Sequence, residues 1–96
     1  MIVHLTDEAV GDLERIGDYI AQDNPRRALS FVLELRDKCL SLASTYQSFP
    51  LISRYGLRRR VHGNYAIFYQ VEADRVVVVH VLHGAMDYAA IFLDSE

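Results

Sequence analysis

The sequence is poor in cysteine and has no long apolar run. Its only cysteine, Cys39, lies inside a predicted helix, so a disulfide framework within the chain is excluded and a reducing compartment is expected. We interpret Cys39 as a small buried apolar residue. No apolar stretch approaches the ~20 residues that cross a bilayer, and the N-terminus lacks the basic and apolar regions of a signal peptide. We therefore expect no membrane partner and a cytoplasmic location.

The chain has no internal repeat, low-complexity tract or linker. Its 96 residues, 51% of them apolar, match the size of one small domain, since domains typically hold ~100–150 residues. We expect a single domain over residues 1–96.

Acidic residues are missing from the middle of the chain. The protein has a net charge of −3, and its acids crowd into the first predicted helix. The stretch from Gln47 to Val71 has no Asp or Glu, yet it contains four arginines: Arg54, Arg58, Arg59 and Arg60. One face should therefore be positive and attract a phosphate backbone or an acidic protein segment. The acidic overall balance argues against generic coating of nucleic acid.

The N-terminal half predicts a short strand and two helices. After a strand over residues 2–5, Thr6 or Asp7 caps a helix whose apolar residues recur at helical spacing. The opposite, polar face of this helix is expected to hold Asp12, Glu14 and Asp18. Pro25 then begins a second helix that runs to about Ser44, because the residue before a proline disfavours the helical region.

The C-terminal half predicts strands. A loop over residues 46–56 precedes an alternating strand over residues 57–62, a turn at "HGN", and two strands joined by a hairpin at "EAD". Four consecutive valines, Val76 to Val79, indicate a strand that is covered on both faces. The final residues form a short helical or extended tail, whose Ile91 and Phe92 cover the sheet. The expected fold is α+β, in the order β-α-α-β-β-β, with two helices packed on a small, largely antiparallel sheet.

The second helix has more apolar surface than one buried stripe needs. Three leucines lie off its buried stripe, which suggests a further packing partner: Leu29, Leu33 and Leu40. Together with the basic stretch, they would form an apolar groove rimmed by positive charge. Such a groove fits an amphipathic, acidic partner segment, bound as a helix or as an added strand.

Two segments resemble a known family. "LTDEAVGDLERIGDYIAQDNP" is similar to the opening of the ParE/RelE toxin superfamily, and "YAIFYQVEADRVVVVHVLHGAMD" is similar to its closing hairpin, so the likeness covers nearly the whole chain. Within the superfamily the sequence is closer to ParE than to RelE. The resemblance implies a RelE/ParE-like fold and a toxin without cofactor that is neutralised in a hetero-oligomer by a ParD-type antitoxin. It also implies DNA gyrase as the target, without sequence-specific DNA binding by the toxin alone.

An alternative function, RelE-like ribosome-dependent cleavage of mRNA, needs a base, cations on the phosphate and an acid. The arginine run could supply the cations, with Arg59 foremost, and His83 or Tyr88 the acid. No suitable base is apparent in the strand region. RelE-like sequences commonly have an arginine after the histidine that ends the last strand, whereas Gly84 follows His83 here. Both departures favour the gyrase inhibitor over the nuclease.

The arginine run allows several readings. Arg58 and Arg60 could form a solvated strand face. Arg59 shares its face with Leu57 and Val61, so it must extend to solvent or pair with a carboxylate, either in an antitoxin's acidic tail or in this fold at Asp87. The set expected to bind antitoxin comprises Leu29, Leu33, Leu40, Arg54, Arg58, Arg59 and Arg60.

The histidines are expected to be structural. His80 and His83 lie three apart on a strand, so they should face opposite sides and could not share a metal ion. His62 and His83 could meet only if their strands pair. Tyr65 and Tyr69 should pack in the core, with their hydroxyls at its rim.

Overall fold

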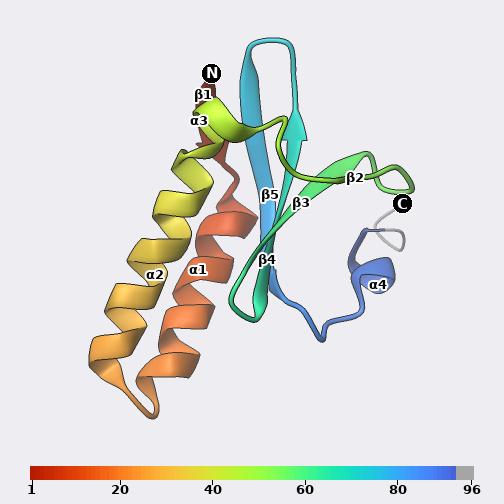
Figure 1. Cartoon of the computed structure of the whole chain (residues 1–96). Helices are drawn as coiled ribbons and strands as arrows, with labels where there is room; N and C mark the ends of the chain where they lie inside the picture. The colour runs from red at the N-terminus through yellow and green to blue at the C-terminus, as the bar shows by residue number, and fades with distance from the viewer. Residues whose placement is uncertain (93–96) are drawn as a thin grey trace.

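The computed structural model describes residues 1–92 as a five-stranded sheet with helices on both faces (Figure 1). The strands are β1 (Ile2–Leu5), β2 (Leu51–Ile52), β3 (Leu57–His62), β4 (Tyr65–Val71) and β5 (Arg75–His83). They lie in the order β1-β5-β4-β3-β2, in which only the β1–β5 pair is parallel. The predicted α+β class with a largely antiparallel sheet is therefore confirmed.

The two faces of the sheet are covered unequally. Helices α1 (Asp7–Ala21), α2 (Pro25–Leu40) and α3 (Leu42–Thr45) pack on one face, and the short α4 (Tyr88–Phe92) packs on the other (Figure 1). The larger apolar core lies under the helices and includes Leu35, Leu42 and Tyr69. A smaller core around Phe68 lies under α4. β5 contributes to both cores and lies between β1 and β4, as the valine run predicts.

Polar caps set where the long helices begin. The Thr6 hydroxyl accepts a hydrogen bond from the Ala9 amide at 3.1 Å and donates to carbonyls of β5, so it fixes the start of α1 against the sheet. Asn24 accepts from the Arg27 amide at 3.0 Å, and Pro25 occupies the first turn of α2. Both predicted helix starts are confirmed.

The second helix ends earlier than predicted. α2 stops at Leu40 instead of Ser44, and α3 is a separate turn. The carbonyl oxygen of Lys38 accepts hydrogen bonds from the Ser41 hydroxyl at 3.0 Å and the Arg60 guanidinium at 3.1 Å. These side chains satisfy a carbonyl in the last turn of α2, which has no partner within the helix once the helix stops. The tertiary contact with Arg60 cannot be read from local sequence.

The expected loop over residues 46–56 contains a short edge strand, β2, which pairs with β3. Both predicted turns are confirmed. Gly63 has a φ of 59° at the first position of the β3–β4 turn, where glycine is favoured, and the Glu72 amide donates to the Arg75 carbonyl at 2.8 Å in the β4–β5 hairpin. The tail forms α4 up to Phe92, and residues 93–96 lie outside the described part of the chain.

Cys39 is buried, as predicted. The thiol lies in the core under the helices, and loss of hydration raises its pKa to about 12. Within residues 1–92, no helix is long and apolar enough to cross a membrane.

Asp12 does not lie on a solvent-exposed face of α1, as the helical pattern predicts. The residue is 4% exposed, and its Oδ2 accepts from the His80 ring at 2.7 Å and from the Val81 amide at 2.9 Å. Arg15 contacts the other carboxylate oxygen at 2.5 Å. Asp12 therefore joins α1 to the middle of β5.

β1 ends opposite Val78, so no strand of residues 1–92 lies beside Val81 on that edge of β5, and the Val81 amide donates to the Asp12 carboxylate. A β-bulge lies just before this point, because Phe68 pairs with His80 but Tyr69 pairs with Val78, which leaves Val79 as an extra residue in β5. The register is regular from His80 to His83, so their side chains face opposite sides of the sheet, as expected: His80 pairs with Phe68 of the smaller core, and His83 pairs with Tyr65 beside the larger core. Both residues border one cavity.

Candidate functional site

Arg58 and Arg60 are tethered inside the fold and do not form the solvated strand face that the sequence suggests. Arg58 donates to the Phe49 carbonyl at 2.6 Å. Arg60 donates to the Ser41 hydroxyl at 2.7 Å as well as to the Lys38 carbonyl, and its guanidinium lies 4.6 Å from the centre of the Phe49 ring. A cation at the C-terminal end of α2 interacts favourably with the helix dipole. Arg60 therefore holds β3 against the end of α2, and Arg58 holds it against the segment that follows α3.

Arg59 points to the other face of the sheet. Its Nε atom is buried and has no hydrogen-bond partner among residues 1–92. The expected ion pair with Asp87 does not form. The Asp87 carboxylate instead accepts from the Ala89 and Ala90 amides at 3.1 and 3.4 Å, which caps α4. An amide close by in sequence satisfies the carboxylate locally, and Arg59 is left without an anionic partner in the described chain.

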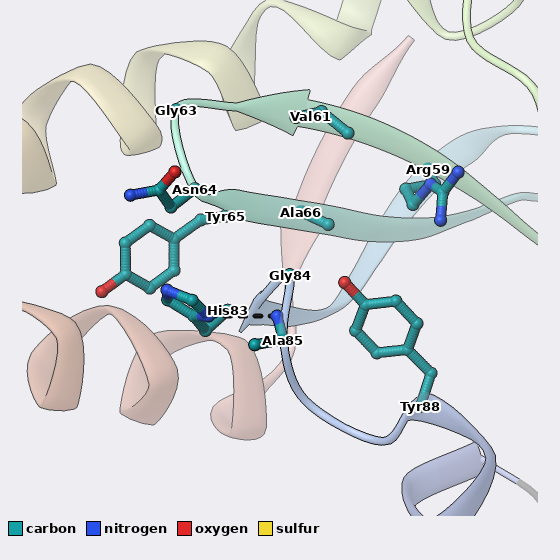
Figure 2. A pocket seen from close by; sticks show the side chains of 10 residues that line it. All are labelled: Arg59, Val61, Gly63, Asn64, Tyr65, Ala66, His83, Gly84, Ala85 and Tyr88. Carbon is teal, nitrogen blue, oxygen red and sulfur yellow. Dashed lines mark hydrogen bonds between the residues drawn. The ribbon is translucent and has the colours of Figure 1, made fainter.

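Arg59 belongs to a pocket of about 520 Å³ at the end of the sheet, between the β3–β4 turn, the end of β5 and α4 (Figure 2). We call this the sheet-end pocket. It brings together all three residues named for the nuclease alternative: Arg59, His83 and Tyr88. Figure 2 shows Arg59 and the Tyr88 hydroxyl toward one end of the pocket, and Asn64, Tyr65 and His83 toward the other. Among the described residues that line it, none is Asp, Glu or Lys.

The hydrogen bond of His83 determines the tautomer of its neutral ring. Its Nδ1 atom accepts from the Ala85 amide at 3.1 Å, so in the neutral ring the proton is on Nε2 (Figure 2). The ring meets the Tyr65 ring edge-on, with 5.2 Å between the centres. The backbone fixes this corner, because the Gly84 amide donates to the Asn64 carbonyl at 2.8 Å. His83 therefore offers a hydrogen-bond donor and not a base.

A second group of charged residues joins α2 to β3. Glu34 contacts Arg27 at 2.5 Å and the His62 ring at 3.2 Å, and His62 stacks on Phe31. The Arg27 guanidinium, and then His62, hold the pKa of Glu34 below its ordinary value of 4.5. Because β4 separates β3 from β5, His62 and His83 are not on adjacent strands. Within residues 1–92, no three metal-ligating side chains lie close enough together to hold a metal ion.

Leu40 of α2 borders a second hollow. A groove of about 460 Å³ runs between α1, α2 and the edge strand β1, and we call it the helix-edge groove. Leu40 lines it, together with Val10 of α1; both are partly exposed, at 44% and 43%. Leu29 and Leu33 are exposed on the same helix but do not line the groove. Its other lining residues are mostly apolar, namely Val3, Leu5, Leu13, Glu14, Val32 and Arg36.

The structure separates the residues that were expected to bind antitoxin together. The leucines lie on α2, on the helix-covered face of the sheet, whereas Arg59 lies on the face of α4. Arg54 is exposed in the turn before β3. The single apolar groove rimmed by all four arginines does not exist, because alternate residues of β3 point to opposite faces.

Sequence reasoning missed several residues of the helix-edge groove. Arg36 fits the helical spacing of Leu29, Leu33 and Leu40, so that spacing could have identified it. Alternation within β1 could have identified Val3 and Leu5. No local signal identifies Asn64, which reaches the sheet-end pocket through the β3–β4 turn.

Comparison with solved structures defines the class of fold. The chain is similar to a chain of the chromosomal ParDE toxin–antitoxin system from P. aeruginosa, with a TM-score of 0.78 and 17% identity over 86% of this chain and 95% of that one. It is also similar to a chain of the RelBE2 toxin–antitoxin complex from Mycobacterium tuberculosis, with a TM-score of 0.66 and 19% identity over 85% and 95%. At these identities the likeness concerns the fold.

The family follows from the sequence itself. The model of the ParE toxin of the type II toxin–antitoxin system parDE matches residues 3–88, and the chain belongs to this family. No curated protein sequence matches the chain. The resemblance seen in the first helix and the closing hairpin is thereby confirmed, and the protein is a ParE-family toxin of the type II class.

Proposed function

We propose that this toxin inhibits DNA gyrase in the cytoplasm and so blocks replication, and that direct binding of a ParD-type antitoxin neutralises it. Membership of the ParE family supports the target. The helix-edge groove supports the mode of neutralisation, because it leaves partly exposed apolar side chains beside an edge strand.

The groove suits an amphipathic segment of the antitoxin. Its walls are aliphatic, and a few well-packed apolar side chains supply much of the binding energy at many interfaces. Arg36 lies on the rim and would pair with a carboxylate of the bound segment, whereas Glu14 would favour a cation. β1 also has one free edge, so an extended stretch could continue the sheet. The apolar groove beside this edge strand is the single observation on which the neutralisation proposal rests.

Calorimetric titration with the cognate antitoxin tests the groove. Leu40→Asp and Val10→Asp place a charge on its apolar wall and should weaken binding ~10-fold or more. Leu51→Asp is the matched control, because Leu51 is 56% exposed on β2 at the opposite edge of the sheet. Equal losses for Leu40→Asp and Leu51→Asp would contradict the assignment.

A supercoiling assay tests the target. The purified chain should inhibit gyrase, and the antitoxin should restore its activity when added in equal amount. Inhibition that persists in the Leu40→Asp variant but is no longer relieved by antitoxin would show that the two interactions use different surfaces. Undiminished supercoiling at a large excess of folded toxin would contradict gyrase as the target.

Cleavage of mRNA is the second candidate function, and the meeting of Arg59, His83 and Tyr88 in one pocket favours it. The chemistry of the pocket is incomplete. Its described lining has no carboxylate or lysine to accept the 2′-hydroxyl proton, and Nδ1 of His83 is occupied by a backbone amide. Gel analysis of mRNA on purified ribosomes should therefore show no toxin-dependent cleavage.

A further inference from the structure

The sheet-end pocket continues around the end of the sheet. A neighbouring cavity of about 380 Å³ shares Gly63, Asn64, Tyr65 and His83 with it and extends to Tyr19 of α1 and Arg27 of α2. We call the two cavities together the sheet-end groove. It passes from α4, around the β3–β4 turn, to the end of the α1–α2 hairpin. The helix-edge groove has none of these residues in its lining.

The charge of this groove is opposite to that of the whole protein. The net charge is −3, yet the described linings of both cavities contain two arginines and no Asp or Glu. Glu34 neutralises Arg27 in part. Arg59 is different, because its buried Nε has no acceptor within the described chain. The rest of the Arg59 guanidinium lines the pocket, where no described carboxylate pairs with it, and an oxyanion is the strongest acceptor for a guanidinium.

The other polar groups in the groove are suited to the same ligand. The Tyr88 hydroxyl and the Asn64 amide can donate to oxygen, and the His83 ring carries its proton on Nε2. Aromatic faces accompany these donors. Tyr65 and His83 form the wall common to both cavities, and Tyr19 is 67% exposed at the far end.

A cation and donors beside a row of aromatic rings are the features that bind single-stranded nucleic acid. A duplex would need a broad basic surface, which two arginines do not provide. An acidic peptide would use the arginines but has no planar bases for the aromatic rings.

We infer that the sheet-end groove binds a short single strand of nucleic acid, with a phosphate on Arg59 and bases against Tyr65, His83 and Tyr19, without cleaving it. This inference goes beyond gyrase inhibition and antitoxin binding, and it requires neither. Binding is independent of sequence, because no described group is arranged to read a base edge. About one or two phosphates are contacted, so the slope of log K against log salt should be about −1.

The wild-type protein gives the most direct test. We would titrate it with oligothymidylate and with oligouridylate of about eight nucleotides and follow the Nε–H signal of Arg59 by NMR. The signal should shift with either strand, and the stronger of the two would identify DNA or RNA as the preferred source. An unmoved Arg59 signal at millimolar strand would overturn the inference.

Variants separate a specific site from general charge attraction. Arg59→Gln should weaken binding ~10-fold, while Arg54→Gln, which removes the same charge from an exposed turn, should leave it unchanged. Tyr88→Phe removes only a hydroxyl and should weaken binding without affecting the fold. Equal losses for Arg54→Gln and Arg59→Gln would refute the site, and so would equally tight binding of an oligoglutamate of matched charge. Loss of antitoxin binding in Leu40→Asp does not bear on this result, so the two proposals fail separately.

Discussion

Asp12 offers the sharpest test of how the fold is held together. The residue is 4% exposed, and its carboxylate accepts a partly buried hydrogen bond from the His80 ring and a buried one from the Val81 amide. Asp12→Ala leaves both donors without a partner, at about 1.5–3 kcal/mol for each bond to a charged group. The contact with Arg15 adds less, because that arginine is largely exposed. We expect a total loss of about 3–5 kcal/mol, a large part of the ~5–15 kcal/mol typical of a domain.

Urea unfolding followed by circular dichroism measures this loss. With a slope of ~1 kcal/mol per molar urea, the midpoint of Asp12→Ala should fall by about 3 M, or the variant should be unfolded in water. Asp12→Asn keeps an acceptor for the Val81 amide and should lose about 1–2 kcal/mol. Asp18→Ala, at an exposed position of the same helix, is the control. A loss below about 1 kcal/mol for Asp12→Ala, equal to that of the control, would refute the reasoning.

Three further predictions concern other contacts. Arg60→Leu should lower the unfolding free energy by about 1–3 kcal/mol in urea, because it removes the donor to the end of α2, whereas Arg54→Leu should change it little. Glu34→Gln should reduce the loss of stability on acidification: the Arg27 guanidinium depresses the pKa of Glu34 in the folded state, so its stabilisation is present above pH 4.5 and lost as pH falls through the depressed value, which thermal melts across this range measure. Cys39 should react with a thiol reagent only on unfolding, because burial raises its pKa to about 12; rapid labelling of the native protein would contradict that burial.

The sequence predicts the fold well where local signals agree with the tertiary structure. Thr6 and Pro25 mark helix starts, Gly63 marks a tight turn, and the run of valines marks a central strand. The helix starts and the tight turn depend on local backbone geometry, and the run of valines indicates burial through its apolar composition. All of these residues lie within the range that the ParE family model matches, residues 3–88.

The predictions fail where a residue that is distant in the sequence determines the local structure. Asp12 is predicted to be a surface residue of an amphipathic helix, but β5, far along the chain, presents an amide and a histidine to it. Arg60, on a strand in the other half of the chain, donates to the Lys38 carbonyl in the last turn of α2. Periodicity predicts which face of a helix or strand a residue occupies, but it does not predict which residues pack against that face.

The candidate site was predictable only in part. The three residues Arg59, His83 and Tyr88 were identified from the chemistry that a nuclease would need, and they do meet in one pocket. The alternation of β3 separates Arg59 from its two neighbours already in the sequence, but only the structure shows that those neighbours are tethered to backbone carbonyls. No local pattern in the sequence shows that the Nε of Arg59 is buried without a hydrogen-bond partner in the described chain.

The most direct test of the account is pulse labelling of DNA and protein synthesis in cells after this chain is induced without its antitoxin. If the toxin inhibits gyrase, DNA synthesis should fall first while translation continues, and a toxin-resistant gyrase should restore it. Early collapse of translation with cleaved mRNA would contradict the account and would mean that the sheet-end pocket is a nuclease site.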